Sequence, residues 1–204
     1  MAVHEVIGVD EVGRGALAGP VVVAAAAVRP GSRFRGGPGK LKDSKKLSPA
    51  RREDWYAYLS KHPGVRFAAA RVYPRGIERL NISGAANLAA LRAVRKLAPA
   101  AISRRNRGVF RVCLDGGLFL KGRKWQEERV PRAKTIVKAD EKIAAVKIAS
   151  IIAKVERDRF MCQLAKRHPG YGFEVHKGYG TSRHLDALAK LGPCAMHRLT
   201  FIPD

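Results

Sequence analysis

The sequence has few cysteines, no long hydrophobic run and few acidic side chains. Its three cysteines are Cys113, Cys162 and Cys194. Their odd number and unpaired spacing indicate neither a disulfide framework nor a zinc site. The longest low-charge run, residues 16–28, is too short to cross a bilayer. Asp10 and Glu11 interrupt the N-terminal apolar segment, so a secretory signal is not indicated and we expect a cytoplasmic protein with no membrane partner.

The shortage of acids makes the chain strongly basic. Only 17 Asp and Glu accompany 40 Lys and Arg, which gives a formal net charge of +23. A charge of this size attracts polyanions and displaces their counterions. Nucleic acid is therefore the first candidate partner and an anionic membrane surface the second, while a basic surface that serves only solubility is the plainer alternative. A chain of 204 residues is long enough for a real core, and we expect one domain over residues 1–204.

Hydrophobic patterning predicts alternating strands and helices. The expected strands are 3–9, 20–28, 65–73, 109–114 and 135–137. The expected helices are 49–59, 83–97, 140–164 and 182–191. The second strand is apolar throughout, which predicts burial on both faces, and Ser48 before Pro49 is a typical helix start. Strands followed by helices, without repeats or linkers, predict an α/β fold with helices packed on a mixed sheet.

Residues 8–20 are the most unusual stretch of the chain. Asp10 and Glu11 are adjacent acids at the end of an apolar run. Neighbouring strand residues point to opposite faces, so both carboxylates can reach one point only if the chain turns there, and glycines permit such a turn. A solvated junction between strand and turn explains the acids alone, but the Gly-Arg-Gly at 13–15 favours a site for phosphate and metal.

Two further acids fit the same pattern. Asp115 ends an apolar strand before two glycines, where it is as readily a turn-forming residue. Asp140 lies at the start of the long predicted helix, where N-capping is the simpler explanation. Lys147 and Lys154 follow at intervals of seven beside Ser150, so we expect Lys147 to lean toward Asp140. This polar stripe is either the solvated side of the helix or the wall of a cleft.

Carboxylates that converge in so basic a chain would repel one another and a phosphate backbone unless a cation joined them. Mg²⁺ binds carboxylate and water oxygens together with substrate phosphate. Two such ions about 4 Å apart can activate an attacking water and stabilise the leaving oxygen. The candidate ligands are Asp10, Glu11, Asp115 and Asp140.

Two other stretches carry side chains suited to nucleic acid. Tyr179 lies between two glycines, where its ring can stack on a sugar or base, although a tyrosine that pins a loop to the core is an equal alternative. Lys45 and Lys46 precede a helix start, where such a pair is usually a solvated face but can contact phosphate in a chain of this charge. His176 alone is more simply structural.

Together these stretches resemble ribonuclease HII, the type 2 ribonuclease H family. The matching segments occur in family order across nearly the whole chain, and the first and last are the most specific. They are residues 9–20, 43–48, 80–82, 114–116, 138–140, 149–159 and 176–181.

The resemblance implies a ribonuclease H-like α/β fold, in which helices flank a five-stranded mixed sheet and extra C-terminal helices occupy roughly residues 160–204. It implies Mg²⁺- or Mn²⁺-dependent cleavage of RNA in RNA–DNA hybrids. It also implies incision 5′ of single ribonucleotides embedded in duplex DNA, which leaves 3′-hydroxyl and 5′-phosphate ends. We expect such a chain to act as a monomer.

The resemblance also assigns roles to residues. The catalytic, metal-binding acids would be Asp10, Glu11, Asp115 and Asp140. The residues that read the 2′-hydroxyl, largely through the backbone, would be Gly13, Arg14 and Gly15. Tyr179 would sense the DNA–RNA junction. The other expected substrate contacts are Lys45, Lys46, Ser150 and Lys154.

One departure from the family pattern and three alternatives stand beside this interpretation. Lys147 replaces a small residue and puts the metal affinity in question, so we expect its replacement by alanine to change the metal requirement. Ribonuclease HIII has an added N-terminal domain, for which we expect no room here. A Holliday-junction resolvase gives no reason for residues 176–181. A non-catalytic basic protein that coats nucleic acid explains the charge but not the four acids.

Overall fold

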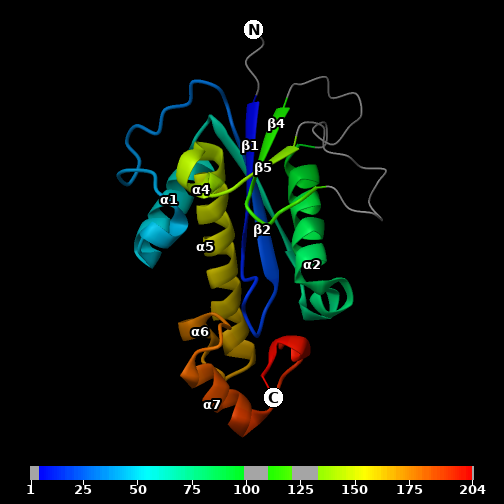
Figure 1. Ribbon diagram of the computed structural model, residues 1–204. Coiled ribbons are helices and arrows are strands. Elements are labelled where there is room, and N and C mark those ends of the chain that lie inside the picture. Colours follow the sequence, from blue (N-terminus) through cyan, green and yellow to red (C-terminus); the bar gives the residue numbers. More distant parts are fainter. Residues whose placement is uncertain (1–4, 99–109, 121–132, 204) are drawn as a thin grey trace.

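A five-stranded mixed sheet with helices on both faces forms the centre of the molecule (Figure 1). The computed structural model describes residues 5–98, 110–120 and 133–203. The strands are β1 (Glu5–Val12), β2 (Val21–Val28), β3 (Val65–Val72), β4 (Phe110–Asp115) and β5 (Ala133–Ile136). Their order in the sheet is β3-β2-β1-β4-β5. β1, β2 and β3 pair antiparallel, whereas β4 runs parallel to both β1 and β5, so the predicted mixed sheet is confirmed.

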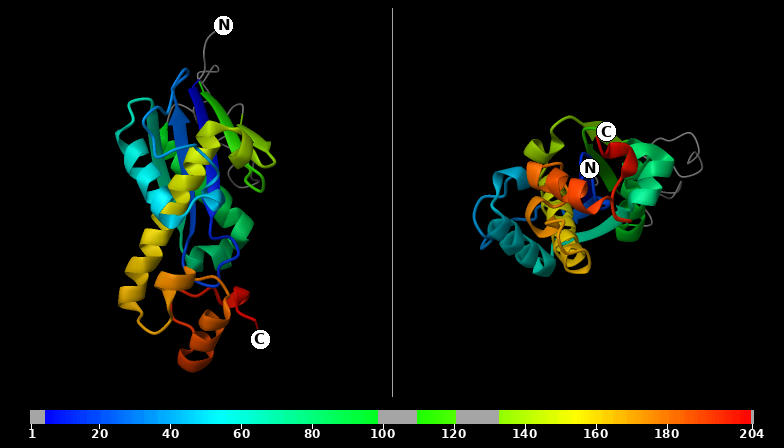
Figure 2. Two further views of the ribbon diagram at one scale, coloured as in Figure 1. Left: turned by 90° about the vertical axis from the view of Figure 1, so that its left-hand side faces the viewer. Right: turned by 90° about the horizontal axis from the view of Figure 1, so that it is seen from below.

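Helices cover the two faces of the sheet and extend past one end. They are α1 (Pro49–Lys61), α2 (Pro74–Leu97), α4 (Ala139–Lys142), α5 (Ala144–Arg167), α6 (Phe173–His176) and α7 (Ser182–Leu191), with short 3₁₀ turns at Ser44–Lys46 and Leu199–Phe201. α1 and α5 lie on one face and α2 lies on the other (Figure 1). The end of α5 continues beyond the sheet and packs with α6 and α7 (Figure 2), as expected for extra C-terminal helices. Among the helices of the described residues, none has the length and apolar character that a bilayer crossing requires.

The local sequence explains where several elements begin. Ser48 caps α1 by accepting a hydrogen bond from the Arg51 amide, and Pro49 occupies the first helical position. Thr181 caps α7 in the same way, and that helix has the predicted bounds. β2 is buried along nearly its whole length, as its apolar sequence predicts, because helices lie against both of its faces.

Gly8 sets the spacing between β1 and α5. A Cβ added to Gly8 would lie 2.2 Å from the backbone atoms Ala145 C and Val146 N. The main chains of strand and helix therefore nearly touch at this point. Alternation along the strand places Asp10 on the same face as Gly8, under the first turns of α5, whereas Val9 belongs to the core on the α2 face.

Two predicted helices differ from the observed ones. The expected helix 140–164 is broken at Ile143, whose extended backbone (φ −111°, ψ 120°) separates α4 from α5. Asp140 and Lys147 thus lie on different helices, and the predicted common stripe is wrong. The expected helix 83–97 corresponds to the part of α2 that follows a kink at Asn81 (φ 56°), and an additional helical segment from Pro74 precedes the kink. This conformation (ψ 169°) is strained for a residue with a side chain, and Asn81 Oδ1 accepts from the Gly84 amide to start the helix again.

Candidate active site

The four predicted acids lie at the carboxyl ends of β1 and β4 and at the start of α4. β1 runs to Val12, further than predicted, so Asp10 and Glu11 belong to the strand itself. β1 and β4 are parallel with Val9 opposite Leu114, which brings Asp10 level with Asp115 at the end of β4. Asp115 Oδ1 then accepts from the Ala139 amide at 2.8 Å and from the Asp140 amide at 3.5 Å. Asp115 thereby fixes the start of α4, and Asp140 is not the N-cap.

Burial leaves these acids short of compensating positive charge. Burial, then Glu11 and Asp115, raise the pKa of Asp10 well above its ordinary value, while a hydrogen bond from Ser150 opposes the shift. Burial raises the pKa of Glu11 to about 7, with a further rise from Asp115 and an opposing effect of Arg14. Burial and Asp115 also raise the pKa of Asp140. The cluster therefore favours any cation that can enter it.

The donor set fits a hard divalent cation. All four candidates offer carboxylate oxygens, which Mg²⁺ and Mn²⁺ prefer, and Glu11 Oε2 is buried without a hydrogen-bond partner in the described structure. Over the described ranges, no three Asp, Glu, His or Cys side chains are already gathered as a ready-made metal cage. Like charges oppose a closer approach of the carboxylates, and Lys45 Nζ, 3.7 Å from Asp140 Oδ2, supplies part of the missing charge.

A cleft of about 290 Å³ opens beside the acids. It is lined by Asp10, Glu11, Val12, Ser44, Lys45, Ser150, Lys154 and Tyr179. Ser44 Oγ and Ser150 Oγ are hydrogen-bonded at 2.7 Å, which joins the turn before α1 to the wall formed by α5. The structure thus brings both acids of β1 together with four of the eight predicted substrate contacts, which are Lys45, Ser150, Lys154 and Tyr179.

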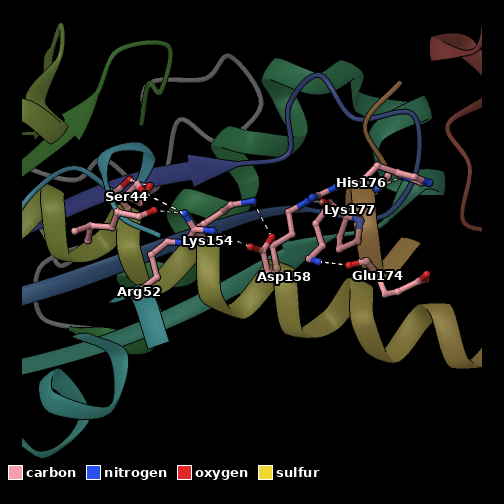
Figure 3. Close-up of polar contacts among 12 residues, drawn as sticks. Ser44, Arg52, Lys154, Asp158, Glu174, His176 and Lys177 are labelled. Carbon is pink, nitrogen blue, oxygen red and sulfur yellow. Dashed lines mark hydrogen bonds and ion pairs between the residues drawn. The ribbon is translucent and has the colours of Figure 1, made fainter. Parts of the chain in front are cut away.

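Two residues that support this wall have no assigned role from the sequence. Lys154 Nζ donates to Asp158 Oδ1 at 2.8 Å, and Arg52 Nη2 lies 3.6 Å from Asp158 Oδ2 (Figure 3). Arg52 Nη1 also donates to the carbonyls of Ser44 and Leu47 at 3.2 and 2.8 Å. Lys154 and Asp158 are four residues apart on one helix, and this spacing could have predicted their ion pair. Nothing in the sequence distinguishes Arg52 from the other basic residues.

The Gly-Arg-Gly segment curves around the end of β1. Gly13 has φ +86°, and a Cβ there would lie 2.2 Å from Arg157 Nε, so only glycine fits. The Arg14 guanidinium donates to Gly117 O and Ser83 Oγ, both at 3.2 Å, and lies 3.6 Å from Glu11 Oε1. The segment therefore borders the acids.

The Tyr179 loop lies directly against this segment. The amides of Leu17 and Ala18 donate to Gly178 O at 2.8 and 3.2 Å. The Tyr179 ring borders the cleft on one side and meets the Arg157 guanidinium, 5.2 Å from the ring centre, on the other. The loop of Tyr179 is thus anchored to the body of the protein, and the residue also borders the cleft, so its stacking on a sugar or base stays a prediction.

The family model of ribonuclease HII matches residues 7–203. The chain belongs to the ribonuclease HII family. It is 41% identical over 198 residues to a ribonuclease HII of Parvibaculum lavamentivorans, with 97% of this chain and 66% of that protein covered. It is 44% identical over 200 residues to a ribonuclease HII of Nitratidesulfovibrio vulgaris, with 95% and 84% covered.

Solved structures agree with the ribonuclease HII fold. The PCNA:RNase HII complex from Archaeoglobus fulgidus superposes with a TM-score of 0.71 at 29% identity, over 98% of this chain and 96% of that chain. Bst-RNase HIII in complex with Mn²⁺ gives 0.62 at 22% identity, over 93% and 70%, and shows the fold alone. Membership of the ribonuclease HII family makes the chain an endoribonuclease of the ribonuclease H type, in a family whose enzymes use divalent metals on nucleic-acid hybrids.

Two of the predicted site residues lie differently from the expectation. Lys46 does not border the cleft and pairs with Glu141 at 3.2 Å. Lys147 lies on α5, and the ion-pair partner of Asp140 is Lys45. The inferred influence of Lys147 on Asp140 therefore loses its geometric basis.

Three buried histidines hold the Tyr179 loop of the ribonuclease HII chain. His176 Nδ1 accepts from the Gly178 amide, which leaves its Nε2–H to donate to Tyr171 O at 2.7 Å (Figure 3). His197 Nδ1 accepts from the Cys194 amide, its Nε2–H donates to His184 Nε2 at 3.1 Å, and His184 Nδ1–H donates to Tyr179 O at 3.0 Å. This arrangement requires neutral imidazoles.

We expect acid to destabilise the protein through these histidines. Burial, with His184, lowers the pKa of His197 to about 4, and burial also lowers the pKa values of His176 and His184. The unfolded chain binds the protons near pH 6.5, so stability that is complete above that pH is lost as the pH falls toward 4, by up to about 3 kcal/mol for His197.

Urea unfolding at a series of pH values measures this loss. The His197→Asn variant should show a shallower decline in the free energy of unfolding than wild type. The buried acids, whose pKa values are raised, change stability in the opposite direction as the pH falls. They are present in both proteins, so the comparison isolates the contribution of the histidine. Equal slopes for the two proteins would contradict the expectation.

Proposed function

We propose that this chain cleaves the RNA strand of RNA–DNA hybrids and incises 5′ of single ribonucleotides in duplex DNA, leaving 3′-hydroxyl and 5′-phosphate ends. The observation that carries the proposal is the undercompensated carboxylate cluster, with the Gly-Arg-Gly segment at its border. We further propose that Asp10, Glu11, Asp115 and Asp140 hold Mg²⁺ or Mn²⁺, and that residues 1–204 act as one catalytic domain, a cytoplasmic monomer.

The protein's own groups have distinct tasks in this proposal. The chemistry that the ions supply when bound is activation of a water and stabilisation of the leaving oxygen. Ser150 lies beside Asp10 in the cleft and lowers the pKa of its carboxyl group, which favours the charged form that binds a cation. Lys45 and Lys154, which line the cleft, attract and orient the phosphodiester. Tyr179 presents its ring to a sugar or base.

A labelled DNA duplex with one ribonucleotide tests the proposal, with an all-DNA duplex of the same sequence as control. We expect incision 5′ of the ribonucleotide in the presence of Mg²⁺ or Mn²⁺, no incision in chelator, and no incision of the control. Metal-independent binding to both duplexes without scission would instead favour a protein that coats nucleic acid.

The net charge predicts a steep salt dependence of binding. Each neutralised phosphate contributes a slope of about −0.9 to a plot of log affinity against log salt, so affinity falls about tenfold from 50 to 200 mM salt for every two phosphates contacted. Fluorescence anisotropy with the labelled duplex in chelator measures this slope. A flat plot would show that the charge of +23 does not act on the duplex.

A further inference from the structure

Arg198 is a buried arginine whose guanidinium faces main-chain carbonyls. Its side chain is 0% exposed. Nη2 donates to Gly13 O at 2.7 Å, Nη1 donates to Arg14 O at 2.8 Å, and Nε donates to Gly19 O at 3.0 Å. Across the described part of the chain, no carboxylate lies within ion-pair distance of it. Burying a cation without an ionic partner costs desolvation free energy, and the hydrogen bonds to these carbonyls offset that cost.

These hydrogen bonds fix the direction of two peptide groups. The C=O and N–H of a trans peptide point in opposite directions. Because the carbonyls of Gly13 and Arg14 point toward Arg198, the amides of Arg14 and Gly15 point away from it. In the described structure neither amide donates to a protein acceptor, and a Cβ added to Gly15 would meet no atom within 4 Å. Two adjacent N–H donors are thus left without a protein acceptor in a segment that borders the acids.

Arg157 supports the same segment from a second side. It is also 0% exposed, and it donates to Pro20 O at 3.2 Å and to Ala18 O at 3.1 Å. Its side chain packs beneath Gly13, while its guanidinium meets the Tyr179 ring. The two arginines therefore lock residues 13–20 in one conformation and connect them to the tyrosine.

We propose that Arg198 is a positioning residue for substrate selection, which holds the Arg14 and Gly15 amides in place to donate hydrogen bonds to the ribose 2′-hydroxyl and its adjacent phosphate. This inference rests on the proposed function. The guanidinium fork suits the task because it donates to three carbonyls in a fixed geometry, whereas a lysine ammonium is a point donor on a flexible stem.

The Arg198→Lys variant tests the proposal through a ratio of affinities. Anisotropy in chelator gives the affinity for the duplex with one ribonucleotide relative to the all-DNA duplex. We expect the wild-type preference to fall about tenfold in the variant, the effect of losing one or two well-placed hydrogen bonds, while affinity for the all-DNA duplex stays within about twofold.

Arg52→Lys is the matched control. Arg52 is also a mostly buried arginine that donates to two carbonyls at the same cleft, but these belong to residues 44 and 47. This variant should bind both duplexes less well and keep their ratio. An unchanged ratio in a folded Arg198→Lys protein would overturn the proposal. A wild type without any preference would remove the proposed function itself, and this proposal with it.

Wild-type protein decides the matter if Arg198→Lys does not fold. Amide resonances of ¹⁵N-labelled protein can be followed on addition of each duplex in chelator. We expect the Arg14 and Gly15 amides to shift more with the ribonucleotide than with the all-DNA duplex, and the Arg198 Nε–H to stay protected from exchange with solvent in both complexes. Equal shifts at residues 14 and 15, or a rapidly exchanging Arg198 Nε–H, would contradict the proposal.

Discussion

Replacing Asp10 by asparagine should lower the rate of incision about a thousandfold or more and leave the fold intact. The substitution keeps the shape of the side chain and removes a charge that the proposed metal chemistry requires. The same charge is unfavourable in the folded protein, because burial, Glu11 and Asp115 raise the pKa of Asp10. The neutral amide should therefore raise the free energy of unfolding by about 1 kcal/mol, or the melting temperature by about 2–4 °C.

Initial rates with the single-ribonucleotide duplex and a thermal melt in chelator measure the two effects. Asp54→Asn is the matched control, since Asp54 is an exposed acid on α1 whose ion-pair partner among the described residues is Arg51 at 3.7 Å. It should keep incision within about twofold of wild type. More than a tenth of wild-type activity in Asp10→Asn would remove Asp10 from the catalytic set.

A single methyl group at Gly8 should be the most damaging small change to stability. In Gly8→Ala the new Cβ would lie 2.2 Å from the backbone of α5, and the main chain cannot rotate away as a side chain can. Strand and helix must separate, so we expect a loss of about 3 kcal/mol or more in the free energy of unfolding.

Urea denaturation measures this loss, with Gly15→Ala as control. A Cβ at Gly15 meets nothing within 4 Å, and that substitution should change the free energy of unfolding by less than about 0.5 kcal/mol. A loss under about 1 kcal/mol in Gly8→Ala would show that α5 can shift on the sheet at little cost.

The parts of the fold that sequence predicts are those with local physical signals. Uniform apolar character marks β2, Ser48 and Pro49 mark the start of α1, and residues 182–191 have both a cap and a helical pattern. The break at Ile143 has no glycine or proline to announce it, so pattern alone predicts one continuous helix. Pro74 is a helix-start signal for α2, but the interruption at Asn81 separates the first turns from the longer helical pattern that the sequence shows.

The candidate site also contains residues that the sequence indicates and residues that only the structure shows. Acids at strand ends stand out in a basic chain, and the parallel pairing of β1 with β4 explains why Asp10 and Asp115 converge from distant positions. The arginines beneath the site could not be distinguished by sequence. Arg157 and Arg198 are two among 40 basic side chains, and only the folded structure shows that their guanidinium groups are buried against carbonyls.

The contacts of Arg198 also determine when the N-terminal segment can finish folding during protein synthesis. They join residue 198 to residues 13, 14 and 19, which leave the ribosome near the beginning of translation. Almost the whole chain must therefore be synthesised before Arg198 can donate hydrogen bonds to the carbonyls of the N-terminal segment. A nascent or stalled chain that ends before residue 198 can carry all four acids and still lack a fixed Gly-Arg-Gly segment. Selectivity for the ribose would then be completed last, so a partly made chain would discriminate less between duplexes than the finished protein.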